Sequence, residues 1–318
     1  MKYSGIGGQA VIEGIMMMKG EDYAVAVRRP DKEIEVKKDT YQSITKKAKI
    51  LQLPFVRGVF RFADSMIIGM RSLTYSASFF EDDEDAEPGK FEQFLDRVFG
   101  EKLESAIMAA VLVISFILAI GIFMPLPLGI ANLFKGVITS DHLMAVLEGV
   151  IRIAIFIIYI KLVSRMEDIR RTFMYHGAEH KCINCVEHGH PLTVKYVRES
   201  SKEHKRCGTS FILIVMVISI LMFMVIRVDT IWMRILSRII LVPVIAGISY
   251  EVLQCAGRSN SKFMDLVSRP GMWMQGLTTK EPDDSMIEVA IAATEAVFDW
   301  REYLTENFPG WEKQLEES

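Results

Sequence analysis

The sequence predicts a mostly α membrane protein, with four transmembrane helices and a cytosolic α+β unit that contains an N-terminal β-hairpin. Half of the 318 residues are hydrophobic although 24% are charged, so the apolar residues must be concentrated in particular segments. Near the N-terminus apolar and polar residues alternate, which is typical of strands. Lysine and arginine are concentrated in one predicted loop, as they are on the cytosolic side of membrane proteins.

Four segments are apolar over a length sufficient to cross a bilayer core, which takes about 20 helical residues. They are residues 105–134, 143–160, 208–226 and 235–256. The first and third contain no charged residue, whereas the second contains Glu148 and Arg152 and the fourth contains Arg238 and Glu251. Glu148 and Arg152 have the spacing at which opposite charges pair on one helix face, so we expect them to neutralise each other.

The distribution of basic residues predicts the orientation. Nine lysines and arginines lie between Ser164 and Gly208, whereas the loop after the first span contains only Lys135. We therefore expect both termini and the loop between the second and third spans to be cytosolic. The N-terminus lacks the pattern of a secretory signal peptide. In the cytosol the cysteines would stay reduced, so metal ligation or simple burial is expected of them, not disulfide bonding.

These patterns divide the chain into three parts. We expect a cytosolic β-rich and amphipathic-helix unit with an acidic linker, a four-span membrane domain with a Cys/His-rich cytosolic loop, and a cytosolic C-terminal segment that packs on the N-terminal unit. The parts are residues 1–103 with the linker at 81–90, residues 104–257 with the loop at 165–207, and residues 258–318.

Shorter patterns predict the elements outside the membrane. Tyr23 to Val36 reads as a hairpin, with a turn at Arg29-Pro30-Asp31-Lys32. Residues 55–80 read as a helix that either packs on the β unit or lies on the anionic inner leaflet. Arg269-Pro270-Gly271 is expected to break the chain. Ser285 and Glu288 form a Ser-x-x-Glu capping box at the start of a final helix.

Five of the six histidines and three of the four cysteines lie between His176 and Cys207. His176-Gly-Ala-Glu179-His180 matches the H-x-x-E-H pattern of inverted zincins. On a helix both imidazoles share one face and can bind one zinc ion, and Glu179 can act as general base.

A third ligand is required for such a site. Glu251 is the stronger candidate, because a carboxylate inside a predicted span is costly unless it has a function. Glu13 is the weaker one. The alternative for Glu251 is a structural pairing with an arginine such as Arg258 or Arg206.

The same loop permits other interpretations. Cys182-x2-Cys185 followed by His204-x2-Cys207 has the spacing of a zinc ribbon with one thiolate replaced by imidazole. Such a site would be closed and structural, with no position open to water. A third interpretation is that no metal binds and that these are surface histidines and small buried thiols.

Several motifs resemble those of a bacterial family of unknown function, the YqhQ-like membrane proteins, whose members are labelled predicted metal-dependent enzymes. The motifs are Gly8-Gln-Ala-Val-Ile-Glu-Gly-Ile-Met-Met, Tyr175-His-Gly-Ala-Glu-His-Lys, Arg206-Cys-Gly-Thr-Ser-Phe, Arg269-Pro-Gly-Met-Trp-Met-Gln and Leu277-Thr-Thr-Lys-Glu-Pro-Asp-Asp. The resemblance covers nearly the whole chain and implies a multi-pass protein of the bacterial cytoplasmic membrane. The site candidates that it implies are Glu13, His176, Glu179, His180, Arg206, Cys207, Glu251, Asp283 and Asp284. Cys182 is not part of the family pattern.

We therefore expect a metal-dependent hydrolase, such as a peptidase, at the cytosolic face of the membrane. Its partners would be the lipid bilayer and a substrate that the sequence does not identify. The alternative is a non-catalytic scaffold in membrane-protein biogenesis or envelope homeostasis, with or without a structural zinc. Its basic loop would then contact a membrane protein, a ribosome or a translocon. A transporter is disfavoured because the spans contain few polar groups, and no nucleic-acid motif is present.

Overall fold

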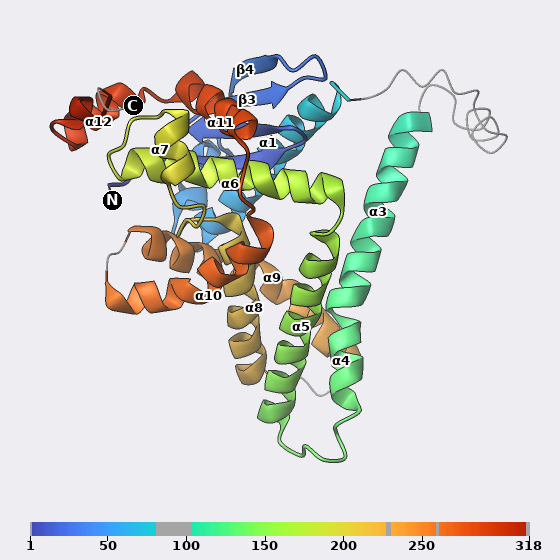
Figure 1. Ribbon diagram of the computed structural model, residues 1–318. Helices are drawn as coiled ribbons and strands as arrows, with labels where there is room; N and C mark the ends of the chain where they lie inside the picture. Colours follow the sequence, from blue (N-terminus) through green and yellow to red (C-terminus); the bar gives the residue numbers. More distant parts are fainter. Residues whose placement is uncertain (1, 81–102, 227–229, 259–260, 316–318) are drawn as a thin grey trace. The chain divides into compact units, whose positions relative to one another are not determined.

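The computed structural model describes residues 2–80, 103–226, 230–258 and 261–315 (Figure 1). The chain forms two compact units, one of residues 1–80 and 160–318 and the other of residues 81–159. The last two predicted spans therefore belong to the same unit as the N-terminal sheet. The expected acidic linker at 81–90 lies outside the described residues.

The first unit contains a four-stranded antiparallel sheet in the order β1-β2-β3-β4. Its strands are β1 (Ile6–Val11), β2 (Gly14–Lys19), β3 (Asp22–Arg28) and β4 (Ile34–Thr40). The predicted hairpin is confirmed as β3 and β4, with Val27 opposite Glu35. β1 and β2 were not predicted as strands.

The sheet separates two apolar clusters, which explains why β2 shows no alternation. Ile15 and Met17 pack into the larger cluster with helices α6 (Glu167–Glu187) and α11 (Asp284–Val297). Met16 packs into the smaller cluster, which includes Ile68 of α1 (Val56–Ala77). A strand buried on both faces needs apolar residues at every position.

Short helices complete this part of the unit. They are α7 (Val194–Glu199), α12 (Trp300–Asn307) and the 3₁₀ helices Ile44–Lys47, Lys49–Gln52 and Trp311–Leu315. The helix expected for residues 55–80 is confirmed by α1. The predicted capping box is wrong: α11 is capped by Asp283, whose carboxylate accepts the Met286 N–H at 3.0 Å. Ser285 lies inside the helix and donates its hydroxyl proton to Asp283.

Three further helices of the first unit are α8 (Gly208–Val225), α9 (Ile231–Arg258) and α10 (Lys262–Thr278). The expected break at Arg269-Pro270-Gly271 is wrong, because α10 continues through it. A Cβ atom on Gly271 would lie 2.6 Å from the Ser210 hydroxyl of α8, so the glycine lets the two helices approach closely. Gln275, one turn further on, donates to the same hydroxyl at 2.8 Å. These contacts stabilise the helix beyond Pro270.

The second unit contains α3 (Leu103–Phe123), α4 (Pro125–Asn132) and most of α5 (Asp141–Val163). The first predicted span is divided at Met124, immediately before Pro125. The expected pairing of Glu148 with Arg152 is confirmed at 2.6 Å.

Four described helical segments are long and apolar enough to cross a membrane, in agreement with the sequence. They are Val113–Asn132, Asp141–Val163, Gly208–Val225 and Ile239–Gly257. The molecule is thus a mostly helical protein with four apolar helices and an N-terminal antiparallel sheet, which is compatible with a membrane protein.

Candidate metal site

Helix α6 positions the two histidines of the H-x-x-E-H motif. His176 and His180 lie one turn apart with ring centroids separated by 4.4 Å. The helix is buried continuously from Gly177 to Glu187. A Cβ atom on Gly177 would collide with the carbonyl oxygen of Lys280, so only glycine permits that segment to lie against α6.

Backbone carbonyls fix the orientation of both imidazoles. His176 Nδ1 lies 3.0 Å from the Thr278 carbonyl, and His180 Nδ1 lies 2.6 Å from the Lys202 carbonyl. A carbonyl oxygen only accepts hydrogen bonds, so each neutral ring carries its proton on Nδ1. Each Nε2 then carries a lone pair that can accept a hydrogen bond or bind a metal ion. Metal-binding histidines are commonly held by their second nitrogen in this way.

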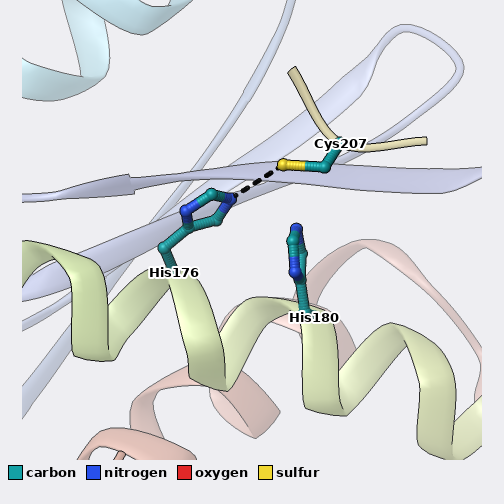
Figure 2. Close-up of side chains that lie close together, drawn as sticks. All are labelled: His176, His180 and Cys207. Carbon is teal, nitrogen blue, oxygen red and sulfur yellow. Dashed lines mark hydrogen bonds between the residues drawn. The ribbon is translucent and has the colours of Figure 1, made fainter. Parts of the chain in front are cut away.

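Cys207 is the third member of the cluster. Its Sγ lies 3.3 Å from His176 Nε2 (Figure 2). One ligand atom from each of His176, His180 and Cys207 lies within 4.8 Å of the others, and this is the only such group of three or more among the described residues. Cys207 also caps α8, where its Sγ accepts the Thr209 N–H at 3.4 Å. The positive end of a helix dipole favours a negatively charged ligand such as a thiolate.

Glu179 lies between the two histidines in sequence but is directed at the sheet. The Gly8 N–H of β1 hydrogen-bonds to its carboxylate. A Cβ atom on Gly8 would lie 3.0 Å from the Glu179 side chain, so the glycine permits this approach. Oε2 of Glu179 is buried and has no hydrogen-bond partner among the described residues. Burial raises the pKa of Glu179 to about 7, opposed by the nearby His176 and the Gly8 N–H.

Polar side chains hold the loop that carries Cys207 against the rest of the unit. Lys181 donates to the carbonyls of Arg198 and Ser200, both at 2.8 Å. Asn184 donates to the carbonyls of Ser201 and Glu203 at 2.6 and 2.9 Å.

Gln275 of α10 holds the same loop from the other side. Its amide bonds both backbone groups of His204 at 2.8 Å. The position of Cys207 is therefore set by several elements.

Arg206 and His204 meet the far end of α6 at Glu187. Glu187 forms an ion pair with Arg206 and accepts the Ser4 N–H and hydroxyl at 2.9 and 2.8 Å. Burial acts to raise the pKa of Glu187, but His204, Arg206 and the Ser4 N–H together lower it to about 2. His204 lies 3.5 Å from Glu187, and its own burial lowers its pKa to about 4. His204 is therefore a neutral core residue.

The structure does not bring Glu251 to the two histidines. Arg57 of α1 forms a two-point ion pair with it, with Nε and Nη2 at 2.7 and 2.5 Å from the carboxylate oxygens. Glu251 therefore pairs with an arginine, as the alternative interpretation held, and that arginine is Arg57. The third side chain of the cluster is Cys207, not Glu251 as predicted.

The remaining candidates lie elsewhere. Glu13 forms an ion pair with Arg171, and Asp284 forms one with Arg198. Cys182 and Cys185 are buried in the larger apolar cluster, and the Cys185 thiol is 3.2 Å from the Pro191 carbonyl. The zinc-ribbon set of Cys182, Cys185, His204 and Cys207 is thus not assembled. The groups that orient the cluster, such as the Thr278 and Lys202 carbonyls, belong to the backbone and leave no signal in the sequence.

The chain matches the family described as "Protein of unknown function (DUF1385)" over residues 53–300, and it belongs to that family. It is also 34% identical over 286 residues to the protein named "Uncharacterized protein YqhQ" of Bacillus subtilis (strain 168), covering 90% of this chain and 89% of that protein. The resemblance to YqhQ-like proteins is thereby confirmed. No solved structure matches the chain.

Proposed function

We propose that this protein is a metal-dependent hydrolase that acts at the cytosolic face of the membrane, with His176, His180 and Cys207 as the metal ligands. The observation that carries the proposal is the arrangement of donors. Both histidines have Nδ1 occupied by a backbone carbonyl, and their Nε2 atoms are grouped with one thiol.

The three donors suit zinc in number, chemistry and spacing. Zinc takes imidazole nitrogen and thiolate sulfur at about 2.0–2.3 Å, which separates the ligands of a tetrahedral ion by about 3.5 Å. Cys207 Sγ and His176 Nε2 are already 3.3 Å apart. Three protein ligands leave one tetrahedral position open, as in catalytic zinc sites.

We assign the role of general base to Glu179, which adjoins His180 on α6 and contacts Gly8 of β1. A pKa of about 7 lets its carboxylate take up a proton from attacking water and release it again at neutral pH. Its unpaired Oε2 offers the acceptor for that proton. A bound metal would supply Lewis-acid polarisation of the scissile bond.

The position of the cluster supports action at the membrane surface. Cys207 is the N-cap of α8, and α8 is one of the four apolar helices. The sheet, α6 and the C-terminal helices belong to the same compact unit as α8 and α9. The nine basic residues between Ser164 and Gly208 favour the cytosol as this side.

One observation favours a structural zinc in a non-catalytic scaffold instead. His180 and Cys207 are 1% and 5% exposed and His176 is half-buried, so two of the three donors are shielded from water. Structural zinc sites are closed in this manner. The two functions differ in the role of Glu179, which a purely structural site does not need.

Metal analysis of the purified full-length protein tests the ligand set. We expect about one zinc per chain, lost in His176→Ala and Cys207→Ser. His188→Ala and Cys255→Ser are matched controls, because His188 bonds only the Asn184 carbonyl and Cys255 is an exposed thiol. Absence of metal from wild-type protein purified without chelator and refilled with zinc would overturn the site.

Glu179→Gln separates enzyme from scaffold. The variant should retain zinc but fail to complement a deletion strain of a bacterium that carries this gene, because an amide cannot accept the proton. Complementation at normal protein level would exclude the hydrolase and leave the structural site.

A further inference from the structure

Residues 43–64 form a hairpin in which the chain runs away from the sheet and returns as the first half of α1. Its open end is closed at Asp64, which accepts the Ser43 hydroxyl at 2.5 Å and the Ile44 N–H at 3.0 Å. The two 3₁₀ helices make up the outgoing arm. We call residues 43–64 the α1 hairpin, and its tip consists of Ile50, Leu53, Phe55 and Val56.

The tip lies beside the middle of the apolar part of α9. A Cβ atom on Gly247 would collide with the Phe55 carbonyl, and one on Gly58 would lie 2.7 Å from the Tyr250 side chain. Glycines at both positions let the two helices approach closely, as small residues do in membranes. Gly247 precedes the end of the apolar segment, Gly257, by ten residues, which is about 15 Å of helix. That depth is about half of a 30 Å bilayer core.

A contact between α1 and α8 gives a depth for the tip that agrees with the depth obtained from α9. The rings of Phe62 and Phe211 are 5.6 Å apart, and Phe211 lies in the first turn of α8, close to Cys207. Phe55 precedes Phe62 by seven residues, which is about 10 Å further along α1. Both helix lengths place the tip deeper along the membrane-spanning direction than the first turn of α8.

Two polar groups at the tip, the Phe55 N–H and the Arg57 guanidinium, are bonded from within the protein. Glu251 accepts from the Arg57 guanidinium and, at 3.3 Å, from the Phe55 N–H, whose residue has a φ of 68°. An unpaired polar group costs several kcal/mol in lipid but little in water. Non-helical backbone at membrane depth is tolerated only where protein satisfies it in this way. This pairing gives Glu251 a function that does not involve the metal site.

The tip nevertheless exposes large apolar side chains. Ile50, Leu53 and Phe55 are 64%, 51% and 55% exposed. Lys46 and Lys47 are exposed on the outgoing arm, nearer the open end, and the long side chain of Lys49 and that of Gln52 are exposed beside the tip. Apolar side chains below and lysines above suit a segment that enters the acyl chains and keeps its charges among anionic headgroups.

We propose that the α1 hairpin is a re-entrant membrane segment whose tip is covered by lipid acyl chains. The inference rests on the membrane insertion of α8 and α9 contained in the proposed function, and it is independent of the metal. It adds a monotopic anchor to the four spans and extends the lipid contact of α9 to α1.

Spin labels on the full-length protein in vesicles of phosphatidylcholine and phosphatidylglycerol test this inference. A label at Leu53, in a Cys255→Ser background, should be accessible to oxygen and shielded from the water-soluble quencher nickel–EDDA. The other three cysteines are buried and stay unlabelled. Leu221 is the matched lipid reference, because it lies within α8 and is 57% exposed. Glu33, in the turn between β3 and β4, is the water reference.

The outcomes are distinguishable. A label at Leu53 that behaves like Leu221 supports the inference. If Leu53 behaves like Glu33 while Leu221 is in lipid, α8 is inserted but the hairpin is not re-entrant. If Leu53 is shielded from both reagents, protein covers the tip, which also overturns the inference. Contact of Leu221 with water would overturn the membrane insertion on which it rests. Zinc content of the labelled proteins reports on the metal site separately.

Discussion

At the scale of single residues, the cluster depends on groups of two kinds. His176 and His180 are spaced by one helical turn, which the sequence makes visible, and their helix was predicted correctly. Cys207 follows His180 by 27 positions, after the end of α6, α7 and their connections, and such a closure leaves no periodic pattern. The buried charge of Glu251 was recognised as unusual, but its partner Arg57 lies 194 positions away and could not be identified. Sequence spacing thus predicted the local part of the site and not the part made by tertiary contacts.

The buried carboxyl of Glu179 predicts a pH-dependent stability. Its pKa is about 7 in the folded protein against 4.5 ordinarily, so the folded state binds the proton more tightly. The free energy of unfolding should therefore fall as pH rises from about 4.5 to 7, by up to about 3 kcal/mol from this group. Glu179→Gln should remove that part of the slope. Thermal unfolding of the metal-free protein in detergent with EDTA, from pH 5 to 8, measures it.

In Glu179→Gln the amide places an unpaired N–H₂ where Oε2 lies, and this changes the free energy of unfolding at every pH. The comparison is therefore made on the change of the free energy of unfolding with pH and not on its absolute value. Glu33→Gln, at an exposed turn, is the control and should leave the slope unchanged. An identical slope in wild-type and Glu179→Gln proteins would show that the carboxylate is ionised throughout.

At the scale of elements, helix α6 depends on close packing of Gly177 against the segment that contains Lys280. Alanine is a better helix former than glycine, so helix propensity alone predicts that Gly177→Ala stabilises the protein. The structure predicts the opposite for metal binding, because the added methyl group displaces the Lys280 carbonyl and with it the Thr278 carbonyl that orients His176. Loss of such an orienting contact weakens metal affinity about 10–100-fold.

Competition with a zinc chelator of known affinity measures the effect of Gly177→Ala. Gly208→Ala is the matched control, since Gly208 adjoins the ligand Cys207 but a Cβ atom there meets nothing within 4 Å. Equal zinc affinities of the two variants would show that the Thr278 carbonyl does not orient His176.

The far end of α6 is tied to the N-terminus and to the Cys207 loop through Glu187. Glu187→Ala should destabilise the protein by about 3–5 kcal/mol at pH 7, because it leaves Arg206, whose side chain is only 11% exposed, without its carboxylate. The lowered pKa of about 2 means that the contribution of Glu187 is full above pH 4.5 and is lost as pH falls toward 2. The difference between wild-type and variant should therefore shrink when thermal unfolding is measured at pH 3.

Glu288→Ala is the control for that experiment. Glu288 pairs with Arg28 at 2.8 Å, but its side chain is 52% exposed, and exposed pairs contribute only about 0–1 kcal/mol. Similar losses in Glu187→Ala and Glu288→Ala would show that the Glu187 ion pair is not specially stabilising.

The elements differ in how well the sequence predicted them. The apolar spans were recovered because each is a long run of apolar residues, and the β3–β4 hairpin because its apolar and polar residues alternate. β2 was missed because burial on both faces removes the alternation, and α10 because Arg269-Pro270-Gly271 was read without its contacts to α8. Tertiary packing overrode local signals in both cases.

At the scale of the whole molecule, the first unit brings distant parts of the chain to one end of α8 and α9. The Lys2 carbonyl accepts the hydroxyl of Tyr303 at 2.8 Å, and the Lys2 N–H bonds the Glu187 carbonyl at 2.9 Å. N-terminus, C-terminal helices and the Cys/His-rich loop therefore share one side of any membrane that α8 and α9 cross.

Cysteine labelling in intact cells should show that this shared side is the cytosol. In a Cys255→Ser background, a cysteine at Gly136 should react with a membrane-impermeant maleimide, whereas one at Lys195 should react only after permeabilisation. Gly136 lies in the connection from α4 to α5, where the nearest basic residue is Lys135, and Lys195 lies within the strongly basic segment. Both positions are exposed, so burial does not account for a difference in their reactivity. External labelling at position 195 would show that the orientation is the reverse of the predicted one. The His176–Cys207 cluster would then face an oxidising compartment, where a free thiolate ligand is less readily maintained.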